Sequence, residues 1–579
     1  MQKISGRSLL ISFLSAFLSI VPIIQSTAVD SSILEERWED KPGMTDGWVM
    51  WADDLFSEFN TSQYPYLTAV GTNGMGGGGS ASTFESIAPC PDMYSGPCKD
   101  ATNMEYYPFL KVCIVESDRD CIESMWVESG PQQISGKFKS YFPEDVKYEV
   151  DGTDRGSMKF DGSAKRAGDS TIPDGISGSL WTIDGVEPGK STTFFVSARI
   201  LGHVNRQGNQ LIRNDERAQV SIDKISTISS FGKSPHVIFF HRDGRYAWSG
   251  AGPARSNQGS CLSADGTMCL LRERTPEGLR VGISLRLTNP LNSWLHGRFS
   301  NPVFSSRQAN NSHLVTLTAD YVRVPYIQES LSPEAKAKVC DPATMARLTL
   351  APGFCNFNSV QNSRKFDEFA TVSPYISQKA DALVSSWRFV TKPGWNIGNS
   401  ACSKPLDRLT GIVSTNATLY DSNAPQFSAS EGTLNYRLGA LHYTPSGDVF
   451  KGSYNLYLDA NYAKCLWGLS SIPLSASISI SGESSSVATT TMKVANGYVD
   501  FHADAFTFSA PTISIKLEDS KSSNSVIPKP SQSGSATSIA ALATPQLSSQ
   551  IMKCVKGSKV IKINLAKSRK CPAGYKKVN

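Results

Sequence analysis

The spacing of the cysteines is the feature that most constrains how this chain can fold. There are twelve cysteines, and three pairs each enclose seven residues: Cys90/Cys98, Cys113/Cys121 and Cys261/Cys269. An even count with short, repeated spacings favours disulfides that close hairpins or loop ends. The chain has no Cys-x-x-Cys motif and no close Cys/His cluster, which disfavours a zinc site. We therefore predict six disulfides between sequence neighbours, the other three being Cys340/Cys355, Cys402/Cys465 and Cys554/Cys571.

The N-terminal segment has the pattern of a secretory signal peptide. Lys3 and Arg7 precede an apolar run from Leu9 to Ile24, and Ser26-Thr27-Ala28 forms a small-residue cleavage site. The alternative is an uncleaved anchor, which Pro22 and the short apolar run disfavour. No later stretch approaches eighteen apolar residues, so we expect no transmembrane segment after signal cleavage. We therefore expect a secreted protein, either extracellular or associated with the cell wall, in a compartment that permits disulfides.

The body of the chain has the periodicity of β-strands. Arg280–Leu287 alternates polar and apolar residues, and Leu314–Val322 does the same. Ala476, Ile478 and Ile480 alternate with serines, which places the apolar side chains on one face. Such alternation predicts antiparallel sheets with one buried face. We expect an all-β fold of two or three antiparallel β-sandwich domains with a small helical insert, a disordered linker and a small disulfide-closed C-terminal module.

Composition shifts along the chain suggest its domain organisation. Ser332-Pro333-Glu334 has the N-cap, N1 proline and early acid of a helix start, and Ser373-Pro374-Tyr375 starts a second candidate helix. A Ser-, Ala- and Pro-rich stretch then separates the body from the C-terminus. We expect a signal peptide at 1–28, an N-terminal segment with a Gly-rich loop at 29–104, a β-sandwich domain at 105–330, a small helical insert at 331–384, a C-terminal β-sandwich domain at 385–518, a linker at 519–550 and a basic disulfide module at 551–579.

The C-terminal module carries most of the unbalanced charge. It has nine basic residues and no acidic ones, so the remaining chain has 57 minus nine, or 48, basic residues against 52 acidic residues. A near-neutral body disfavours nucleic-acid binding, whereas a cationic module suits a polyanionic surface. We expect an anionic cell-envelope polymer to bind through Lys553, Lys556, Lys559, Lys562, Lys567, Arg569, Lys570, Lys576 and Lys577. The alternative is that these lysines only solubilise the chain.

Two segments resemble uncharacterised secreted proteins of actinobacteria. One begins at Lys464-Cys465-Leu466-Trp467-Gly468-Leu469 and continues through Val487–Thr491 and Phe506–Ile513. The other is the basic tail, similar to actinobacterial endings of the form Cys-Val-Lys-Gly…Lys-Cys-Pro-Ala-Gly-Tyr-Lys-Lys, although here Val578-Asn579 follows the last lysines. Trp294–Arg298 matches more loosely. The resemblance implies an exported Gram-positive envelope protein and assigns no catalytic residues.

Motifs of catalysis are missing from the sequence. There is no Gly-x-Ser-x-Gly elbow and no His-Glu-x-x-His. Gly189-Lys190-Ser191 lacks the earlier glycine of a P-loop, and Glu187-Pro188-Gly189 fits a turn into a strand. Trp294, His296 and Arg298 would share one face of a strand, where they form a candidate ligand site for a sugar or carboxylate. The alternative is a strand edge with a partly buried Trp, which we favour.

Two hypotheses of different classes follow. The leading one is a non-enzymatic surface protein that presents β-sandwich domains for adhesion or structural interaction, with the tail contacting the wall. The alternative is an extracellular protein that binds or cleaves carbohydrate, which would need paired carboxylates that only the fold can bring together. We expect no catalytic residues, no metal and no cofactor, and a glycan or another surface protein as further candidate partners.

Overall fold

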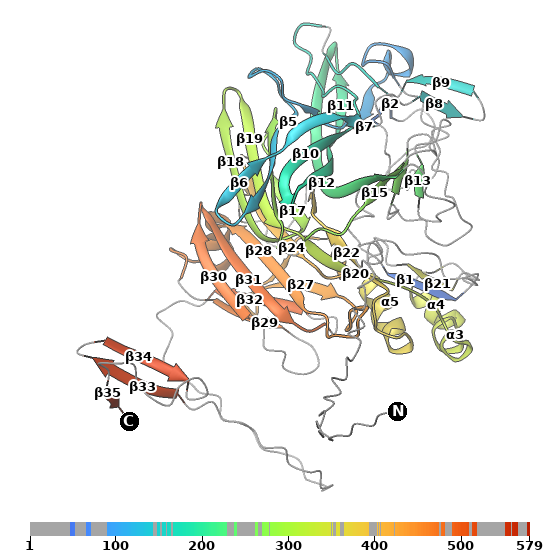
Figure 1. The fold of residues 1–579 in the computed structure, drawn as a ribbon. Coiled ribbons are helices and arrows are strands. Elements are labelled where there is room, and N and C mark those ends of the chain that lie inside the picture. Colours follow the sequence, from blue (N-terminus) through green and yellow to red (C-terminus); the bar gives the residue numbers. More distant parts are fainter. Residues whose placement is uncertain are drawn as a thin grey trace, which may run out of the picture. The chain divides into compact units, whose positions relative to one another are not determined.

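The computed structural model describes residues 47–517 apart from internal gaps, the longest being 52–64, 71–89 and 240–260, together with the strand residues between 551 and 578. The predicted signal peptide, the Gly-rich loop and the linker at 519–550 lie outside the described residues. Within the described part the chain is mostly β, with several sheets rich in antiparallel pairs and few helices, as predicted (Figure 1).

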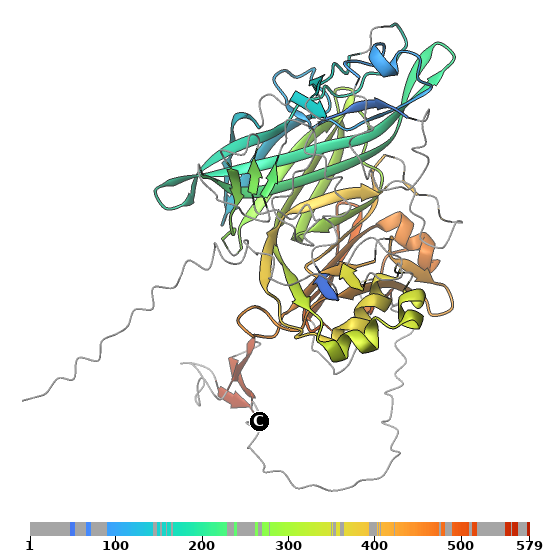
Figure 2. The ribbon, with the colours of Figure 1, turned by 90° about the vertical axis from the view of Figure 1, so that its right-hand side faces the viewer.

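The largest sheet follows a path that runs through most of the body. In the described residues its order is β13-β14-β15-β12-β23-β17-β24-β28-β31-β30, and β7, β10, β11, β3 and β2 branch from it. β11 and β12 are long strands that form one hairpin, visible as the extended green strands of Figure 2. The bounds are β2 Leu67–Ala69, β3 Asn103–Tyr106, β7 Lys137–Phe142, β10 Gly178–Glu187, β11 Lys190–Gln207, β12 Gln210–Ile228, β13 Val237–Phe239, β14 Cys261–Ser263, β15 Cys269–Arg272, β17 Ser293–Arg298, β23 Arg388–Lys392, β24 Leu409–Thr415, β28 Gly452–Asp459, β30 Thr489–Ala495 and β31 Tyr498–Phe506.

A second sheet packs its apolar face against β10, β11 and β12. Alternating residues of β16, among them Val281 and Ile283, share one hydrophobic core with Trp181 and Val220 of the large sheet. The alternation in the sequence therefore identified a buried face correctly. The order is β18-β19-β16-β5-β4 with β6 beside β5, and the bounds are β4 Lys111–Val112, β5 Cys121–Ser129, β6 Gln132–Ser135, β16 Arg280–Leu287, β18 Ser300–Ala309 and β19 Ser312–Asp320.

A third sheet covers the opposite face of the large one. Its residues Tyr436 and Ile515 share a second core with Val413 and Phe501 of β24 and β31. Ala476, Ile478 and Ile480 of β29 are partly buried while the intervening serines are exposed, as predicted. Its order is β25-β27-β32-β29 with β26 beside β27, and the bounds are β25 Leu419–Tyr420, β26 Gln426–Ser428, β27 Thr433–Gly439, β29 Ala476–Ile480 and β32 Thr512–Leu517.

The predicted boundary near residue 385 falls at β22 (Ala382–Ser386), directly before β23, a strand of the large sheet. β23, which follows it, pairs with β12 and β17, which both precede it. Strands assigned to the 105–330 and 385–518 segments are thus neighbours in one sheet, and residues 1–522 form one compact unit. Local periodicity identifies strands but carries no information on which distant strand becomes the neighbour, because pairing is decided by packing.

The helical insert is present, with a different second helix from the one predicted. Ser332 caps α3 by accepting a hydrogen bond from the amide of Ala335, as predicted. The second candidate helix is wrong: α5 ends at Val372, Ser373–Tyr375 is a short 3-10 turn, and a strand begins at Ala382. Figure 2 shows the yellow-green helices beside the blue strand β1. The bounds are α3 Pro333–Val339, α4 Pro342–Arg347, α5 Lys365–Val372, η3 Ser373–Tyr375, and in the adjoining sheet β1 Trp48–Trp51, β20 Val322–Ser330, β21 Asn356–Asn358 and β22 Ala382–Ser386.

Four smaller elements lie outside these groups. Asp459 caps the helix α6 (Ala460–Trp467), which ends at Gly468 in a left-handed conformation. The short turn η2 (Gly96–Cys98) lies inside the first predicted disulfide loop. β8 (Lys147–Val150) and β9 (Thr153–Ser157) form a hairpin of their own.

Four of the six predicted disulfides join described cysteines. The bonds Cys90–Cys98, Cys113–Cys121, Cys340–Cys355 and Cys402–Cys465 are all present. The side chains of Cys261, Cys269, Cys554 and Cys571 lie outside the described residues, so those two pairings stay predictions. In the backbone, Cys269 is registered opposite Ser263, two residues from Cys261.

The C-terminal residues form a separate unit, residues 523–579. Its described strands are β33 (Ile551–Lys556), β34 (Lys559–Asn564) and β35 (Lys576–Val578), with β33 in the centre and both neighbours antiparallel to it. β33 and β34 form a hairpin in which Lys556 is registered with Lys559.

We predict that non-reducing peptide mapping of the native protein will recover Cys261 linked to Cys269 and Cys554 linked to Cys571. Each short closed loop stabilises the fold by about 2–4 kcal/mol in the chain-entropy account. Recovery of free thiols at these positions, or of a cross-link such as Cys261 to Cys554, would contradict the pairing.

We also predict that a chain ending at Glu518 melts like the whole protein. Residues 519–550 have little apolar content to bury, and the body and the C-terminal unit are compact by themselves. Calorimetry of both chains should give the same main transition within about 2 °C, a shift that corresponds to about 2 kcal/mol in a body of this size. A lower or broader transition in the shortened chain would show that the tail packs on the body.

Candidate functional sites

The residues of the candidate ligand site lie deep inside the body. Trp294, His296 and Arg298 do share one face of β17, as predicted, but their exposed fractions are 0%, 1% and 0%. β17 is not the strand edge that the sequence suggested, because it lies between β23 and β24. Its two faces meet two different cores: Leu295 belongs to the first and Trp294 to the second.

Contacts around this row are those of a structural core. The Arg298 guanidinium donates to the carbonyls of Thr415 and Thr418 at 3.1 Å each, which fixes the chain after β24. It also lies over the Tyr420 ring, 4.6 Å from the centroid. Burial, with smaller contributions from nearby cations, holds the pKa of His296 well below its usual value, so the imidazole stays neutral. The neutral His296 and the carbonyl-bound Arg298 thus stabilise the core around β17. Neither side chain is placed to bind a ligand at the surface.

The Cys113–Cys121 loop displays the most exposed aliphatic pair among the described residues. Ile114 is 86% exposed and Val115 is 54% exposed. We predicted the disulfide but missed these two residues, which follow Cys113 directly in a loop too short to bury them. Apolar side chains of this size normally lose most of their contact with water on folding, so the loop is a candidate interaction site.

A single carboxylate shapes the tip of this loop. Asp118 Oδ2 accepts hydrogen bonds from the amides of Ile114 at 2.7 Å and Val115 at 3.0 Å. The Asp118 amide in turn donates to the Val115 carbonyl at 3.1 Å. These bonds from Val115 and Ile114 hold the pKa of Asp118 below its usual value, and the nearby Lys111 ammonium, 4.0 Å from Oδ1, acts in the same direction.

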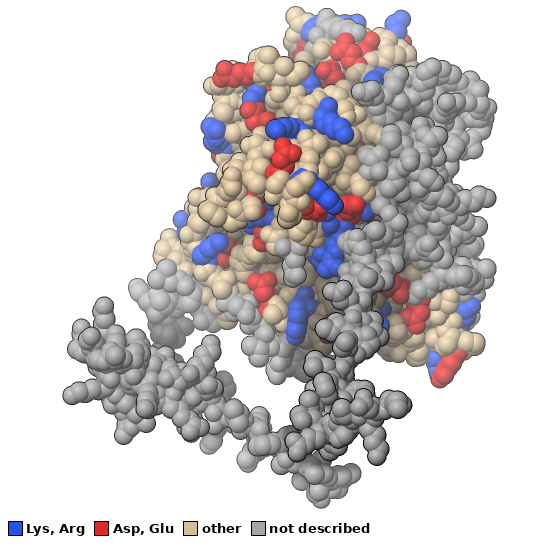
Figure 3. Space-filling view, viewed as in Figure 1, with Lys and Arg blue, Asp and Glu red and all other residues tan. Residues whose placement is uncertain are grey.

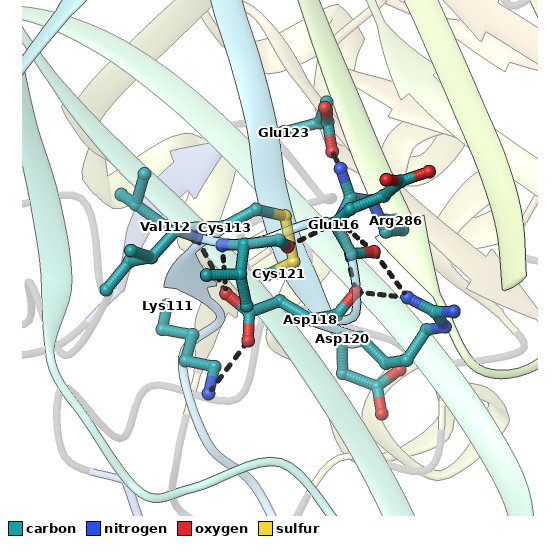
Figure 4. The surroundings of a disulfide bond; sticks show 12 residues. Lys111, Val112, Cys113, Glu116, Asp118, Asp120, Cys121, Glu123 and Arg286 are labelled. Atoms are coloured by element: carbon teal, nitrogen blue, oxygen red, sulfur yellow. Dashed lines mark hydrogen bonds and ion pairs between the residues drawn. A yellow bond between two sulfur atoms is a disulfide. The ribbon is translucent and has the colours of Figure 1, made fainter. Parts of the chain in front are cut away.

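Arg286 of β16 fastens the loop to the sheet below it. Its Nη1 donates to the carbonyls of Val115 and Glu116 at 2.8 Å each and of Asp118 at 3.4 Å. Its Nη2 forms an ion pair with Glu123 of β5. Figure 4 shows this guanidinium reaching the loop from the neighbouring strand, with the disulfide at the base. A planar donor with several acceptors fixes backbone position more firmly than one hydrogen bond would.

The C-terminal end of the loop is anchored by a buried aspartate. Asp120, in a left-handed conformation at φ 52°, accepts from the Thr288 amide at 2.9 Å and from the Thr288 hydroxyl at 2.8 Å. It also pairs with Arg213 at 2.7 Å. On the other side, Arg119 donates to the carbonyl of Asn310, in the β18–β19 turn. The loop is thus held at both ends, and its tip has a fixed conformation.

The backbone register of the C-terminal unit brings lysines opposite one another. Lys553 of β33 is registered with Lys562 of β34, and Lys556 with Lys559. On the other edge of β33, Cys554 and Val555 are registered with Lys577 and Lys576. The remaining predicted envelope-binding residues, Lys567, Arg569 and Lys570, lie outside the described residues. Like charges at opposed positions of antiparallel strands repel each other and destabilise the pair.

The body shows no concentration of charge of one sign on the face drawn in Figure 3. Its visible face in Figure 3 mixes basic and acidic side chains, in line with its near-neutral sequence. Among the described residues, no group of three or more His, Cys, Asp or Glu is placed to hold a metal ion. None of the described helices is long and apolar enough to cross a membrane.

Comparison with known proteins places the chain in no family. No family model, no curated protein and no solved structure matches it.

We predict that Asp118→Asn loosens the tip of the loop. Loss of the carboxylate weakens the two amide bonds, which in this part-exposed setting contribute about 1 kcal/mol in total, so protection of the Ile114 and Val115 amides from hydrogen exchange should fall roughly fivefold. In the native protein, where the aspartate pKa is lowered, the protection should hold above about pH 4 and decline as pH falls further.

The matched control is Glu116→Gln, because that carboxylate bonds to the Asn310 side chain and not to the tip amides. Amide protection that is unchanged in Asp118→Asn, or that falls equally in Glu116→Gln, would contradict this role for Asp118.

Proposed function

We propose that this chain is a secreted, non-enzymatic protein of the Gram-positive cell surface or cell wall. It presents β-sandwich domains, two or three in number, for adhesion or structural interaction, and its C-terminal unit contacts an anionic envelope polymer. The exported location is supported by the four disulfides between described cysteines, which form and persist in oxidising compartments.

The lysine-to-lysine register of the C-terminal unit is the observation that carries the proposal. A small sheet that opposes Lys553 to Lys562 and Lys556 to Lys559 concentrates positive charge at fixed spacing. A bound polyanion relieves the repulsion between these lysines, so binding and sheet stability reinforce each other. A merely solubilising surface has no need to oppose like charges across two strands.

Two features of the body support a binding role over a catalytic one. The Trp294, His296 and Arg298 row is closed to solvent and fixes the chain after β24. In the Cys113–Cys121 loop, in contrast, a network of hydrogen bonds fixes the backbone, and the aliphatic side chains of the loop stay exposed to solvent. Rigid presentation of an apolar tip is typical of recognition surfaces.

We predict that the whole protein binds purified Gram-positive cell walls in a salt-dependent manner. Binding should be tight at low ionic strength and should weaken steeply toward high salt, because charges are screened over about 8–10 Å at physiological ionic strength. The chain ending at Glu518 should not bind. Binding that survives high salt unchanged, or that the shortened chain retains, would contradict the electrostatic role of the tail.

Lys553→Glu separates binding from folding. It converts an opposed Lys–Lys pair into Glu–Lys, so the sheet should become more stable while wall binding falls roughly tenfold or more at low salt, since each lysine near an anionic surface contributes about 1 kcal/mol. Lys451→Glu, at an exposed lysine of the body, is the matched control and should leave binding unchanged. Equal losses in both variants would indicate a nonspecific effect of net charge.

A further inference from the structure

The six lysines in the described strands of the C-terminal unit divide equally between the two faces of its sheet. Successive residues of a strand lie on opposite faces, and directly opposed residues share a face. We call the face that holds Cys554 the cysteine face and the opposite one the lysine face. The cysteine face holds Lys556, Lys559 and Lys577, and the lysine face holds Lys553, Lys562 and Lys576.

The centre of the cysteine face is apolar. Met552 is opposed to Ile563, and Cys554 is opposed to Ile561, so these residues form one block on neighbouring pairs of the hairpin. The lysines of this face lie beside the block, at the turn and on the edge strand β35. An apolar block on a small sheet contributes to stability only when it is covered from water.

The strand order shows that the chain must cross one face of β33. β34 and β35 are both antiparallel to β33 and pair with its opposite edges, so they are parallel to each other (Figure 1). A connection between two parallel strands that flank a third has to pass over one face of the strand between them. Such crossovers are right-handed in nearly all proteins.

The hairpin turn determines which face a right-handed crossover covers. β33 ends at Lys556 and β34 begins at Lys559, so these lysines form the hydrogen-bonded pair that closes a two-residue turn. For L-residues, β34 then lies to the right of β33 and β35 to its left, when β33 points up and the cysteine face is viewed. A right-handed crossover from β34 to β35 passes over that face. The predicted Cys554–Cys571 disulfide requires the same side, because Cys571 belongs to the connection.

The opposite, lysine face is therefore the open one, and its charges are close together. Hydrogen-bonded and non-hydrogen-bonded pairs alternate along a hairpin, so Lys553 and Lys562 form a non-hydrogen-bonded pair with Cα atoms only about 4.5 Å apart. Lys576 is opposed to Val555, two residues along β33 from Lys553, which places it diagonally about 7–8 Å from Lys553. One lysine of each strand thus contributes to a compact cationic row.

We propose that the lysine face is the surface on which the C-terminal unit binds a linear polyanion, which lies across the strands from β34 over β33 to β35. This inference rests on the proposed function and assigns it to Lys553, Lys562 and Lys576. Lysine ammonium groups act as point charges and lack the planar fork with which arginine binds one carboxylate in two places. The face therefore suits a chain of closely spaced single charges, carried by phosphodiester or carboxylate groups.

Two triple variants of the whole protein, equal in net charge, test the proposal. The lysine-face variant has Lys553→Gln, Lys562→Gln and Lys576→Gln, and the matched cysteine-face control has Lys556→Gln, Lys559→Gln and Lys577→Gln. Binding to purified cell walls, inorganic polyphosphate and poly-L-glutamate is measured at about 0.15 M salt, where charges beyond about 8 Å are largely screened.

The lysine-face variant should bind roughly a hundredfold more weakly than the native protein, since it loses three lysines in contact with the polymer. The control should lose no more than about threefold, because its lysines act only at a distance. The logarithmic slope of affinity on salt concentration should fall by about two to three in the first variant and by less than one in the second, because each lost contact releases fewer counterions. The model polymer that the native protein binds more tightly identifies the anionic group as phosphate or carboxylate.

Hydrogen exchange of the 551–564 segment checks that the sheet stays folded in both variants, since replacing an opposed lysine pair removes a repulsion. Equal losses in the two variants, or a larger loss in the control, would overturn the assignment to the lysine face and leave the proposed wall binding intact. A native protein that binds walls but neither model polymer would overturn the polyanion chemistry. A native protein that binds none of the three would overturn the proposed function itself.

Discussion

The body depends on the burial of β17 and β24 on both faces. These two strands form a parallel pair at the centre of the largest sheet, and every residue of each is buried. Trp294 and Val413 project into one core, Leu295 and Ile412 into the other. Close packing also requires glycine here: a side chain at Gly297 would lie 2.2 Å from the Phe299 ring, and one at Gly411 would lie 2.4 Å from the Trp294 ring. A change in either core is therefore felt in the other.

This central burial moves the candidate functions to the periphery. Arg298 and the neutral His296 belong to the buried centre of the body and are not accessible to a ligand. The Cys113–Cys121 loop is attached to strands of the rigid sheet through Arg286 and Asp120, so the scaffold pre-organises it. The C-terminal unit is compact by itself, so the wall binding that we propose for it does not require the body.

Sequence reasoning succeeded where the cause is local. Alternation found β16, β19 and β29, because one-sided burial has a period of two residues. Cysteine spacing found four disulfides, and Ser332 identified a helix start.

Prediction from the sequence failed where contacts between distant segments decide the structure. The pairing of β23, directly after the predicted boundary near residue 385, with β12 is a long-range contact. The burial of Trp294, His296 and Arg298 comes from β23 and β24 on either side. The exposure of Ile114 depends on Arg286, far along the chain.

Native-state hydrogen exchange along β17 and β24 tests the central claim most directly. If the two cores share these strands, the amides of Leu295 and Ile412 should be among the slowest to exchange in the chain. Their opening free energy should equal that of strands from both cores, such as β16 and β31, because only global unfolding exposes them. Exchange of β24 and β31 through an opening that leaves β16 protected would show that the cores unfold independently. That result would contradict the account.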